Sequence, residues 1–128
     1  HEQAPASCRV SVFLEPKKMD EKQWQALQRI QPSRVELYTE AYAEAFARGS
    51  FEDVLQEYRD CAEHAIKLGL EVNAGHDLDA TNVTPFLEAI PYVSEVSIGH
   101  AFICDCLEGG LKATVEKYLR AIRRAHGS

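Results

Sequence analysis

The 128-residue chain lacks several features that mark whole classes of protein. No apolar run approaches the roughly 20 residues needed to cross a membrane. The net charge of −6 leaves no excess of positive charge for nonspecific binding to nucleic-acid phosphates. Residues His1 to Ser7 lack the charged region and apolar run of a secretory leader. We therefore expect a soluble, cytoplasmic protein with no nucleic-acid and no membrane partner.

The cysteines also lack the spacing of a zinc site. Cys104 and Cys106 are separated by one residue, whereas zinc-binding pairs are usually separated by roughly two to four, and no second pair follows. Since 45% of the residues are hydrophobic, the chain can form a core without disulfides. We expect reduced thiols and no metal ion.

What the chain does contain is an alternation of strand and helix patterns. Runs of β-branched and aromatic residues bounded by breakers predict strands at 9–14, 34–39, 70–74 and 93–98. Apolar residues at helical spacing predict helices at 21–30, 51–68, 82–90 and 111–124. Asp20 and Ser50 are expected to cap the first two helices. Ala41 to Gly49 is interpreted as a loop long enough to be a lid.

The order βαβαβαβα predicts an α/β fold with a parallel sheet. A doubly wound sheet normally has about five strands, whereas a TIM (β/α)8 barrel has eight in about 250 residues. Four units in 128 residues are half of such a barrel. We therefore expect residues 1–128 to form a single segment, strands five to eight, with the N-terminal half of the barrel absent from the chain. A doubly wound binding module remains the alternative.

Polar residues gather where the predicted strands end, which is where a parallel barrel holds its active site. His76 follows the third strand and is a candidate general acid or base, because an imidazole titrates near neutral pH. A loop histidine with only a structural hydrogen bond is the alternative. Gly99 and His100 follow the fourth strand, where free N–H groups at a short helix start would bind phosphate. An ordinary βα turn is the alternative there.

Glu36 lies between Val35 and Leu37 in the second predicted strand. If its two apolar neighbours pack against outer helices, Glu36 points into the barrel. A carboxylate there is costly unless it has partners or a task. We expect this inward orientation; the opposite phase would place Glu36 beneath a helix.

These motifs resemble the pyridoxine 5′-phosphate synthase family. Val72 to His76 and Ile98 to Ala101 resemble the ends of the last two strands of that family's barrel. Ser11 to Glu15 is similar to its fifth strand and Val35 to Ala43 to its sixth. The resemblance runs from about Val10 to Ile122. It implies a (β/α)8 barrel, commonly a homo-octamer, that joins 3-amino-2-oxopropyl phosphate to 1-deoxy-D-xylulose 5-phosphate in vitamin B6 biosynthesis and releases inorganic phosphate and water.

The resemblance also implies roles for individual residues. His76 would be the proton donor, and Glu36 would stabilise charged intermediates. Asp77, Gly99 and His100 would bind the phosphate of the aminoketone. Imine formation, proton shifts, dehydration and ring closure need acid–base groups, and no metal or redox cofactor is implied.

Three residues depart from the family pattern. Asp77 stands where the family often has glycine, and its carboxylate would repel a phosphate, so Asp77 would bind only through its backbone N–H. The strand-six pattern Glu-x-His-Thr-Gly here has Tyr38 and Glu40 at the histidine and the last glycine. Both changes alter the local hydrogen bonding, while Glu36 itself is retained.

The resemblance leaves part of the site outside the chain. The family's other bases and its phosphate-binding arginines come from the first four strands, so we expect the 128-residue chain alone to be inactive. Another phosphate-binding barrel enzyme, an isomerase or aldolase, is the alternative. An aldolase would use a Schiff-base lysine at a strand end, and no lysine lies inside a predicted strand.

Overall fold

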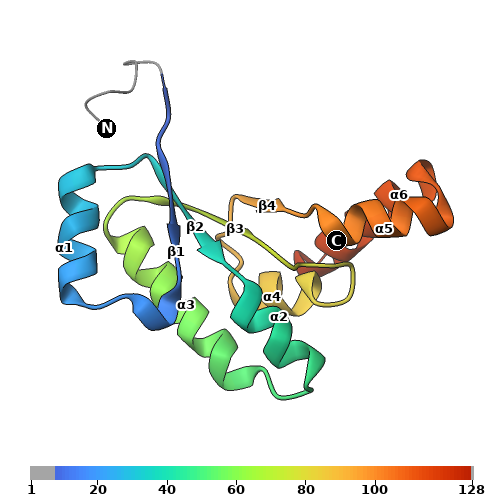
Figure 1. Ribbon diagram of the computed structural model, residues 1–128, viewed down its shortest axis with the longest axis horizontal. Coiled ribbons are helices and arrows are strands. Elements are labelled where there is room, and N and C mark those ends of the chain that lie inside the picture. The colour runs from blue at the N-terminus through green and yellow to red at the C-terminus, as the bar shows by residue number, and fades with distance from the viewer. Residues whose placement is uncertain (1–7, 128) are drawn as a thin grey trace.

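The fold is α/β, with four parallel strands that lie side by side in chain order (Figure 1). The computed structural model describes residues 8–127, so the interpretation of His1 to Ser7 lies outside the described residues. The strands are β1 (Ser11–Leu14), β2 (Arg34–Tyr38), β3 (Glu71–Gly75) and β4 (Glu95–Ser97). The prediction of a parallel sheet is confirmed.

Helices connect the strands and follow the last one. They are η1 (Pro16–Lys18), α1 (Glu21–Ile30), α2 (Glu40–Ala47), α3 (Glu52–Lys67), α4 (Val83–Ala89), α5 (His100–Gly109) and α6 (Leu111–Ala125). The Asp20 cap is confirmed, because its side chain accepts a hydrogen bond from the Gln23 backbone N–H at 2.9 Å. Within the described residues, no helix is both long and apolar enough to span a bilayer.

Two local predictions are wrong. The segment predicted as a loop from Ala41 to Gly49 is mostly helix α2, because its alanines favour helix and Tyr42 and Ala45 are buried on one side. Ser50 does not cap α3; Phe51 occupies the N-cap position without a side-chain cap, and its N–H donates to the Glu52 carboxylate at 3.2 Å.

The fourth strand is shorter than predicted. Val93 stands before it in a turn, where its N–H donates to the Ile90 carbonyl oxygen at 3.3 Å. The Val93 side chain is buried in the core although its backbone is not part of the strand. The apolar pattern at the start of the predicted strand 93–98 is therefore explained by burial of a residue that precedes β4. The helix that follows is longer than the short one predicted and runs to Gly109.

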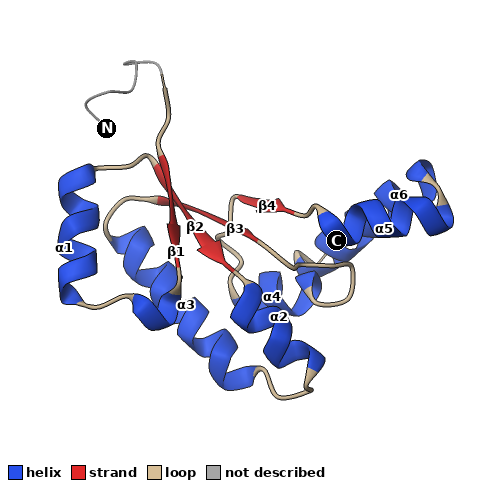
Figure 2. Cartoon of the chain, in the orientation of Figure 1, coloured by secondary structure: helices blue, strands red, loops and turns tan. Residues whose placement is uncertain are grey.

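One face of the sheet is apolar and covered. Val35, Leu37, Val72 and Ala74 are fully buried in the core formed with the helices. Figure 2 shows helices α1 to α4 gathered on one side of the sheet. Burial of each large side chain stabilises the fold by roughly 1.5–3 kcal/mol before the entropy cost of ordering it.

The opposite face is polar, and no helix of residues 8–127 covers it. Its residues alternate with the buried ones, as expected for side chains of period two. On β1 this face presents Phe13, which is 66% exposed although it is aromatic. Glu36 lies on this face of β2, half-buried between its fully buried neighbours Val35 and Leu37. The predicted phase of β2, with Glu36 turned away from the helices, is therefore confirmed.

Both outer strands of the sheet have a free edge. β1 pairs only with β2, and β4 pairs only with β3, within residues 8–127. Backbone groups on such edges can pair with a further strand, and natural proteins usually cover or block them. The sheet therefore has room for another strand on either side.

Candidate active site

The carboxyl ends of the four strands meet at one edge of the sheet. Register pairs Tyr38 with Gly75 and Gly75 with Ser97, so the ends of β2, β3 and β4 are level. This edge brings Glu36 and His76 together on the polar face, while Gly99 and His100 follow the neighbouring strand. Parallel strands place such groups together because all their C-termini point the same way.

Glu36 leans over Gly75 on the adjacent strand. A Cβ atom built at Gly75 would overlap Glu36 Oε1 and would lie 3.1 Å from Ser97 Cβ. Only glycine leaves room for the Glu36 carboxyl group here, so Gly75 contributes to the site by having no side chain. Burial raises the pKa of Glu36, Glu95 raises it further, and the nearby His76 lowers it. The pKa of Glu36 is therefore higher than that of an ordinary surface glutamate.

His76 is held by its backbone in an uncommon conformation. Its φ is +98°, and the next residue, Asp77, has φ +56°. The Thr39 N–H donates to the Gly75 carbonyl oxygen at 2.9 Å, and the Thr39 hydroxyl donates to the His76 carbonyl oxygen. Thr39 is fully buried, so it fixes the strand exit from which the exposed imidazole projects. Positive φ in a non-glycine residue costs free energy and is found preferentially at functional sites.

The left-handed conformation explains why Asp77 can replace a glycine. Aspartate tolerates positive φ better than most residues because its short side chain can hydrogen-bond locally. The Asp77 side chain is exposed, and its charge is among the causes that raise the pKa of the Tyr38 hydroxyl.

Tyr38 is a site residue whose contact the sequence reasoning missed. Its ring stacks on the His76 imidazole, with centroids 4.3 Å apart and an interplanar angle of 30°. A hydrogen bond to Glu40 raises the pKa of the Tyr38 hydroxyl. Thus Tyr38 and Glu40, the two departures in the strand-six pattern, form one coupled pair beside His76. Predicting this contact would require the register between β2 and β3, which a single sequence does not give.

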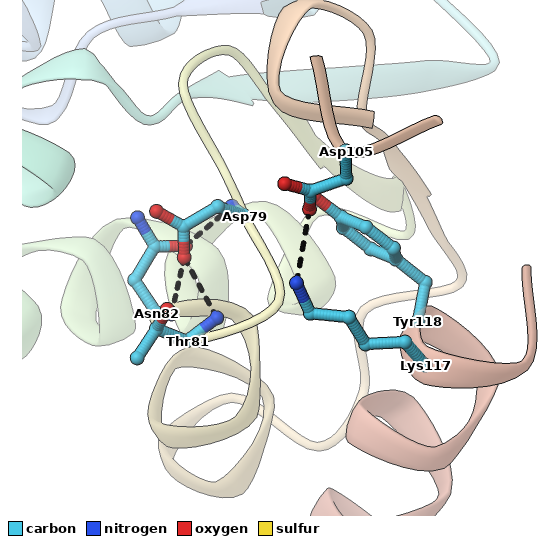
Figure 3. A network of polar contacts seen from close by, with 6 residues as sticks. All are labelled: Asp79, Thr81, Asn82, Asp105, Lys117 and Tyr118. Carbon is cyan, nitrogen blue, oxygen red and sulfur yellow. Dashed lines mark hydrogen bonds and ion pairs between the residues drawn. The ribbon is translucent and has the colours of Figure 1, made fainter. Parts of the chain in front are cut away.

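The loop after His76 is braced by side-chain hydrogen bonds. Asp79 Oδ1 accepts from the backbone N–H groups of Thr81 and Asn82, each at 2.7 Å (Figure 3). Asn82 Oδ1 accepts from the Asp79 N–H at 2.8 Å, and its amide donates to the Asp77 carbonyl oxygen at 3.2 Å. From α2, the buried Tyr42 hydroxyl donates to the Asn82 carbonyl oxygen at 2.7 Å. The segment that carries Asp77 is therefore fixed before any ligand binds.

Gly99 and His100 stand at the start of α5. Gly99 has an ordinary negative φ, and a Cβ there would meet nothing within 4 Å, so no crowding by described residues requires glycine at this position. His100 Nε2 lies 3.7 Å from Cys104 Sγ, one turn along the same helix. The His100 ring therefore turns toward its own helix, while the first backbone N–H groups of α5 lack intrahelical partners.

Helix α5 is tied to α6 by one carboxylate. Asp105 Oδ2 accepts from the Tyr118 hydroxyl at 2.9 Å and pairs with Lys117 Nζ at 3.2 Å (Figure 3). These two donors lower the pKa of Asp105, so it stays ionised. Phe102 packs edge-on against the Tyr118 ring, with centroids 5.5 Å apart. The orientation of the helix that starts at His100 is set by these contacts.

No group of three or more His, Cys, Asp or Glu side chains in residues 8–127 has the arrangement of a metal site. The chemistry available at this edge is that of a carboxyl group, an imidazole and backbone N–H groups. Such a set can move protons and hold an anion.

Comparisons with known proteins agree with the resemblance. The family model described as "Pyridoxal phosphate biosynthesis protein PdxJ" matches residues 1–124. The pyridoxine 5′-phosphate synthase of Albidiferax ferrireducens is 47% identical over 114 residues, 89% of this chain and 44% of the relative. That of Cytophaga hutchinsonii is 44% identical over 119 residues, 93% of this chain and 48% of the relative.

The chain spans a little under half the length of these curated relatives. The similarity nevertheless includes all four strands and the edge that carries Glu36 and His76. A family match over nearly the whole chain, together with relatives above 40% identity, decides its membership. The chain belongs to the PdxJ family of pyridoxal phosphate biosynthesis proteins.

Proposed function

We propose that the chain supplies strands five to eight of a (β/α)8 barrel with pyridoxine 5′-phosphate synthase activity. Its four units would be the C-terminal half, and the first four units would lie outside residues 1–128. Three features support this: the strands follow chain order, one face is polar and without helices, and both sheet edges are free. In a closed barrel the polar face becomes the interior and each free edge gains a partner strand.

The observation that carries the proposal is the approach of Glu36 and His76 across Gly75. In the proposed reaction, 3-amino-2-oxopropyl phosphate condenses with 1-deoxy-D-xylulose 5-phosphate to close the pyridine ring. His76 donates a proton to a leaving oxygen, and Glu36 stabilises the cationic nitrogen intermediates. A carboxyl group close to an imidazole that stacks on Tyr38 suits these two roles.

We further propose that the aminoketone phosphate binds between two turns. The Asp77 N–H contributes from the braced loop, and the free N–H groups at Gly99 and His100 contribute from the start of α5. The helix dipole favours a dianion there. The exposed Asp77 carboxylate turns away from the phosphate, which its left-handed backbone permits. The complete enzyme would act as a cytoplasmic homo-octamer.

The test is a product assay of the full-length protein with both phosphorylated substrates. We expect His76→Ala to lower kcat by about 100-fold or more, because general acid catalysis typically contributes 10²–10⁴-fold. His126→Ala is the matched control, since His126 is exposed at the end of α6 and should leave turnover unchanged. Normal turnover by the His76 variant would remove the proton-donor role.

A second experiment tests the half-barrel. We expect the purified 128-residue chain to form no pyridoxine 5′-phosphate, and co-expression with the first four units of the Albidiferax ferrireducens relative to restore activity. Glu36→Gln in the same mixture should abolish that recovery. Product formed by the 128-residue chain alone would refute the proposal that the missing strands complete the site.

A further inference from the structure

A charge network occupies the part of the polar face that the proposed chemistry does not use. Arg34 begins β2, and its guanidinium reaches across β3. Arg34 Nη2 lies 3.4 Å from Glu71 Oε2, and Nη1 lies 3.7 Å from Glu95 Oε2. The Arg34 side chain is only 14% exposed, whereas that of Glu95 on β4 is 62% exposed. One largely buried cation therefore bridges three strands.

Asn73 sits between the two ends of this bridge. With its amide oxygen turned toward β2, it accepts from Arg34 Nη1 at 3.1 Å and donates to the Val72 carbonyl oxygen at 3.3 Å. The Asn73 side chain is nearly buried on β3. It thus links the guanidinium to the row of residues that contains Glu36.

Strand register places Glu36, Asn73 and Glu95 in the same row. Adjacent strands are about 4.8 Å apart, so the Glu36 and Glu95 backbones are separated by about 10 Å with Asn73 between them. Glu95 raises the pKa of Glu36, and His76 opposes it. The polar and charged groups on this side of the sheet around Glu36 are Glu15, Arg34, Tyr38, Glu71, Asn73, His76, Glu95 and Ser97.

As a stabilising device the network is poor. Both ion pairs are long, and Arg34 Nε is buried without a hydrogen-bond partner in residues 8–127. Burial of a guanidinium with incomplete pairing costs free energy that two long contacts do not repay. The electrostatic effect of this network on the carboxyl group of Glu36, which lies in the same row as Glu95, explains the network better.

We propose that Arg34 and Glu95 are positioning residues that set the charge state of Glu36. Glu95 favours the protonated carboxyl group, and Arg34 limits that effect by pairing with Glu95. The two residues thus act on Glu36 in opposite directions. The catalytic meaning of this balance rests on the proposed function, but the electrostatic coupling does not.

The coupling predicts shifts of opposite sign. Glu95→Gln removes the negative charge and should move the titration of Glu36 to lower pH. Arg34→Gln removes the cation and leaves Glu95 unpaired, so it should move the titration to higher pH. Arg34→Lys keeps the charge and should stay near the wild-type midpoint.

The experiment uses the full-length protein. The pH dependence of carbodiimide labelling at Glu36, read by peptide mass spectrometry, gives its titration midpoint whether or not the protein is active. The pH profile of kcat with both substrates gives the catalytic counterpart. Glu63→Gln is the matched control, because Glu63 pairs with Arg59 on α3, away from the polar face.

Labelling midpoints that move in opposite directions in the Glu95 and Arg34 variants support the proposal. Shifts in the same direction, or no shift in the Glu95→Gln protein with an unchanged circular dichroism spectrum, overturn it. If Arg34→Gln does not fold, the labelling midpoint of Glu95→Gln is compared with that of Arg34→Lys. A lower midpoint in Glu95→Gln still supports the proposal, and an equal or higher one overturns it. If the two variants shift in opposite directions but the wild-type protein forms no product, the proposed function is refuted and the electrostatic coupling stands.

Discussion

Gly75→Ala is the sharpest single test of the site geometry. The new methyl group would overlap Glu36 Oε1 and lie 3.1 Å from Ser97 Cβ and 3.3 Å from the Ser97 carbonyl oxygen. Glu36 can swing aside, whereas the Ser97 contacts belong to the neighbouring strand and yield only if β3 and β4 separate slightly. We therefore expect both a displaced carboxylate and a strained sheet.

The magnitude follows from these two contacts. Adding a methyl group to a well-packed region typically costs about 1–3 kcal/mol. Replacing glycine by alanine restores about 0.4–1 kcal/mol by restricting the unfolded chain. The free energy of unfolding should thus fall by roughly 1–2 kcal/mol. In the full-length protein kcat should fall as well, because Glu36 no longer lies beside His76.

Urea unfolding followed by fluorescence measures the cost, since the chain has one tryptophan, Trp24, buried against His64. In the Glu36→Ala background the cost of Gly75→Ala should shrink by about 0.5 kcal/mol or more, the coupling expected for residues in contact. Gly109→Ala is the control, since a Cβ there meets nothing. An unchanged unfolding midpoint for Gly75→Ala, or no coupling to Glu36, would refute this account of the site.

Four further outcomes follow from single residues. Because burial raises the pKa of Glu36 above its ordinary value of 4.5, its ionisation opposes folding, so Glu36→Gln should stabilise the chain slightly at pH 7 and lose that advantage below pH 4.5, as thermal unfolding across pH will show. Asp77→Val should cost about 1–2 kcal/mol in urea unfolding because its φ is +56°, whereas Asp77→Gly should be tolerated; equal stability of the two variants would contradict the left-handed assignment. Tyr42→Phe should cost about 0.5–1.5 kcal/mol by removing the shorter of the two hydrogen bonds that the Asn82 carbonyl oxygen accepts, and a neutral change in urea unfolding would argue against that bond. Burial raises the pKa of the Cys61 thiol to about 11, so a thiol reagent at pH 8 should label Cys61 only after unfolding; labelling of the folded chain at that residue would show that the core opens there.

The order of strands and helices could be predicted from the sequence because its signals are local. Strand alternation, the Asp20 cap and the glycine after α3 each lie within a few residues of the element they define. The helical segment at Glu40–Ala47 was missed because so short a stretch between two elements is also typical of a loop.

The same distinction between local and long-range signals applies to the residues of the site. His76 and the turn at Gly99 could be proposed from their places at strand ends, and Glu36 from its place between two apolar neighbours within a strand. The space at Gly75, the Tyr38 stack on His76 and the bridge from Arg34 to Glu95 each join neighbouring strands. Their geometry depends on register between segments far apart in the chain, which one sequence does not supply.

The strands of the sheet lie in the order in which they occur in the sequence, and this order affects how the protein can fold. Within residues 8–127 every strand pairs only with the strand of the preceding or following unit, so none of these pairings must wait for a distant segment. In the proposed barrel, only the pairing that closes the sheet would join segments far apart in the chain. Sheets of this kind can grow one unit at a time as the polypeptide leaves the ribosome, and each newly added strand offers its outer edge as the template for the next.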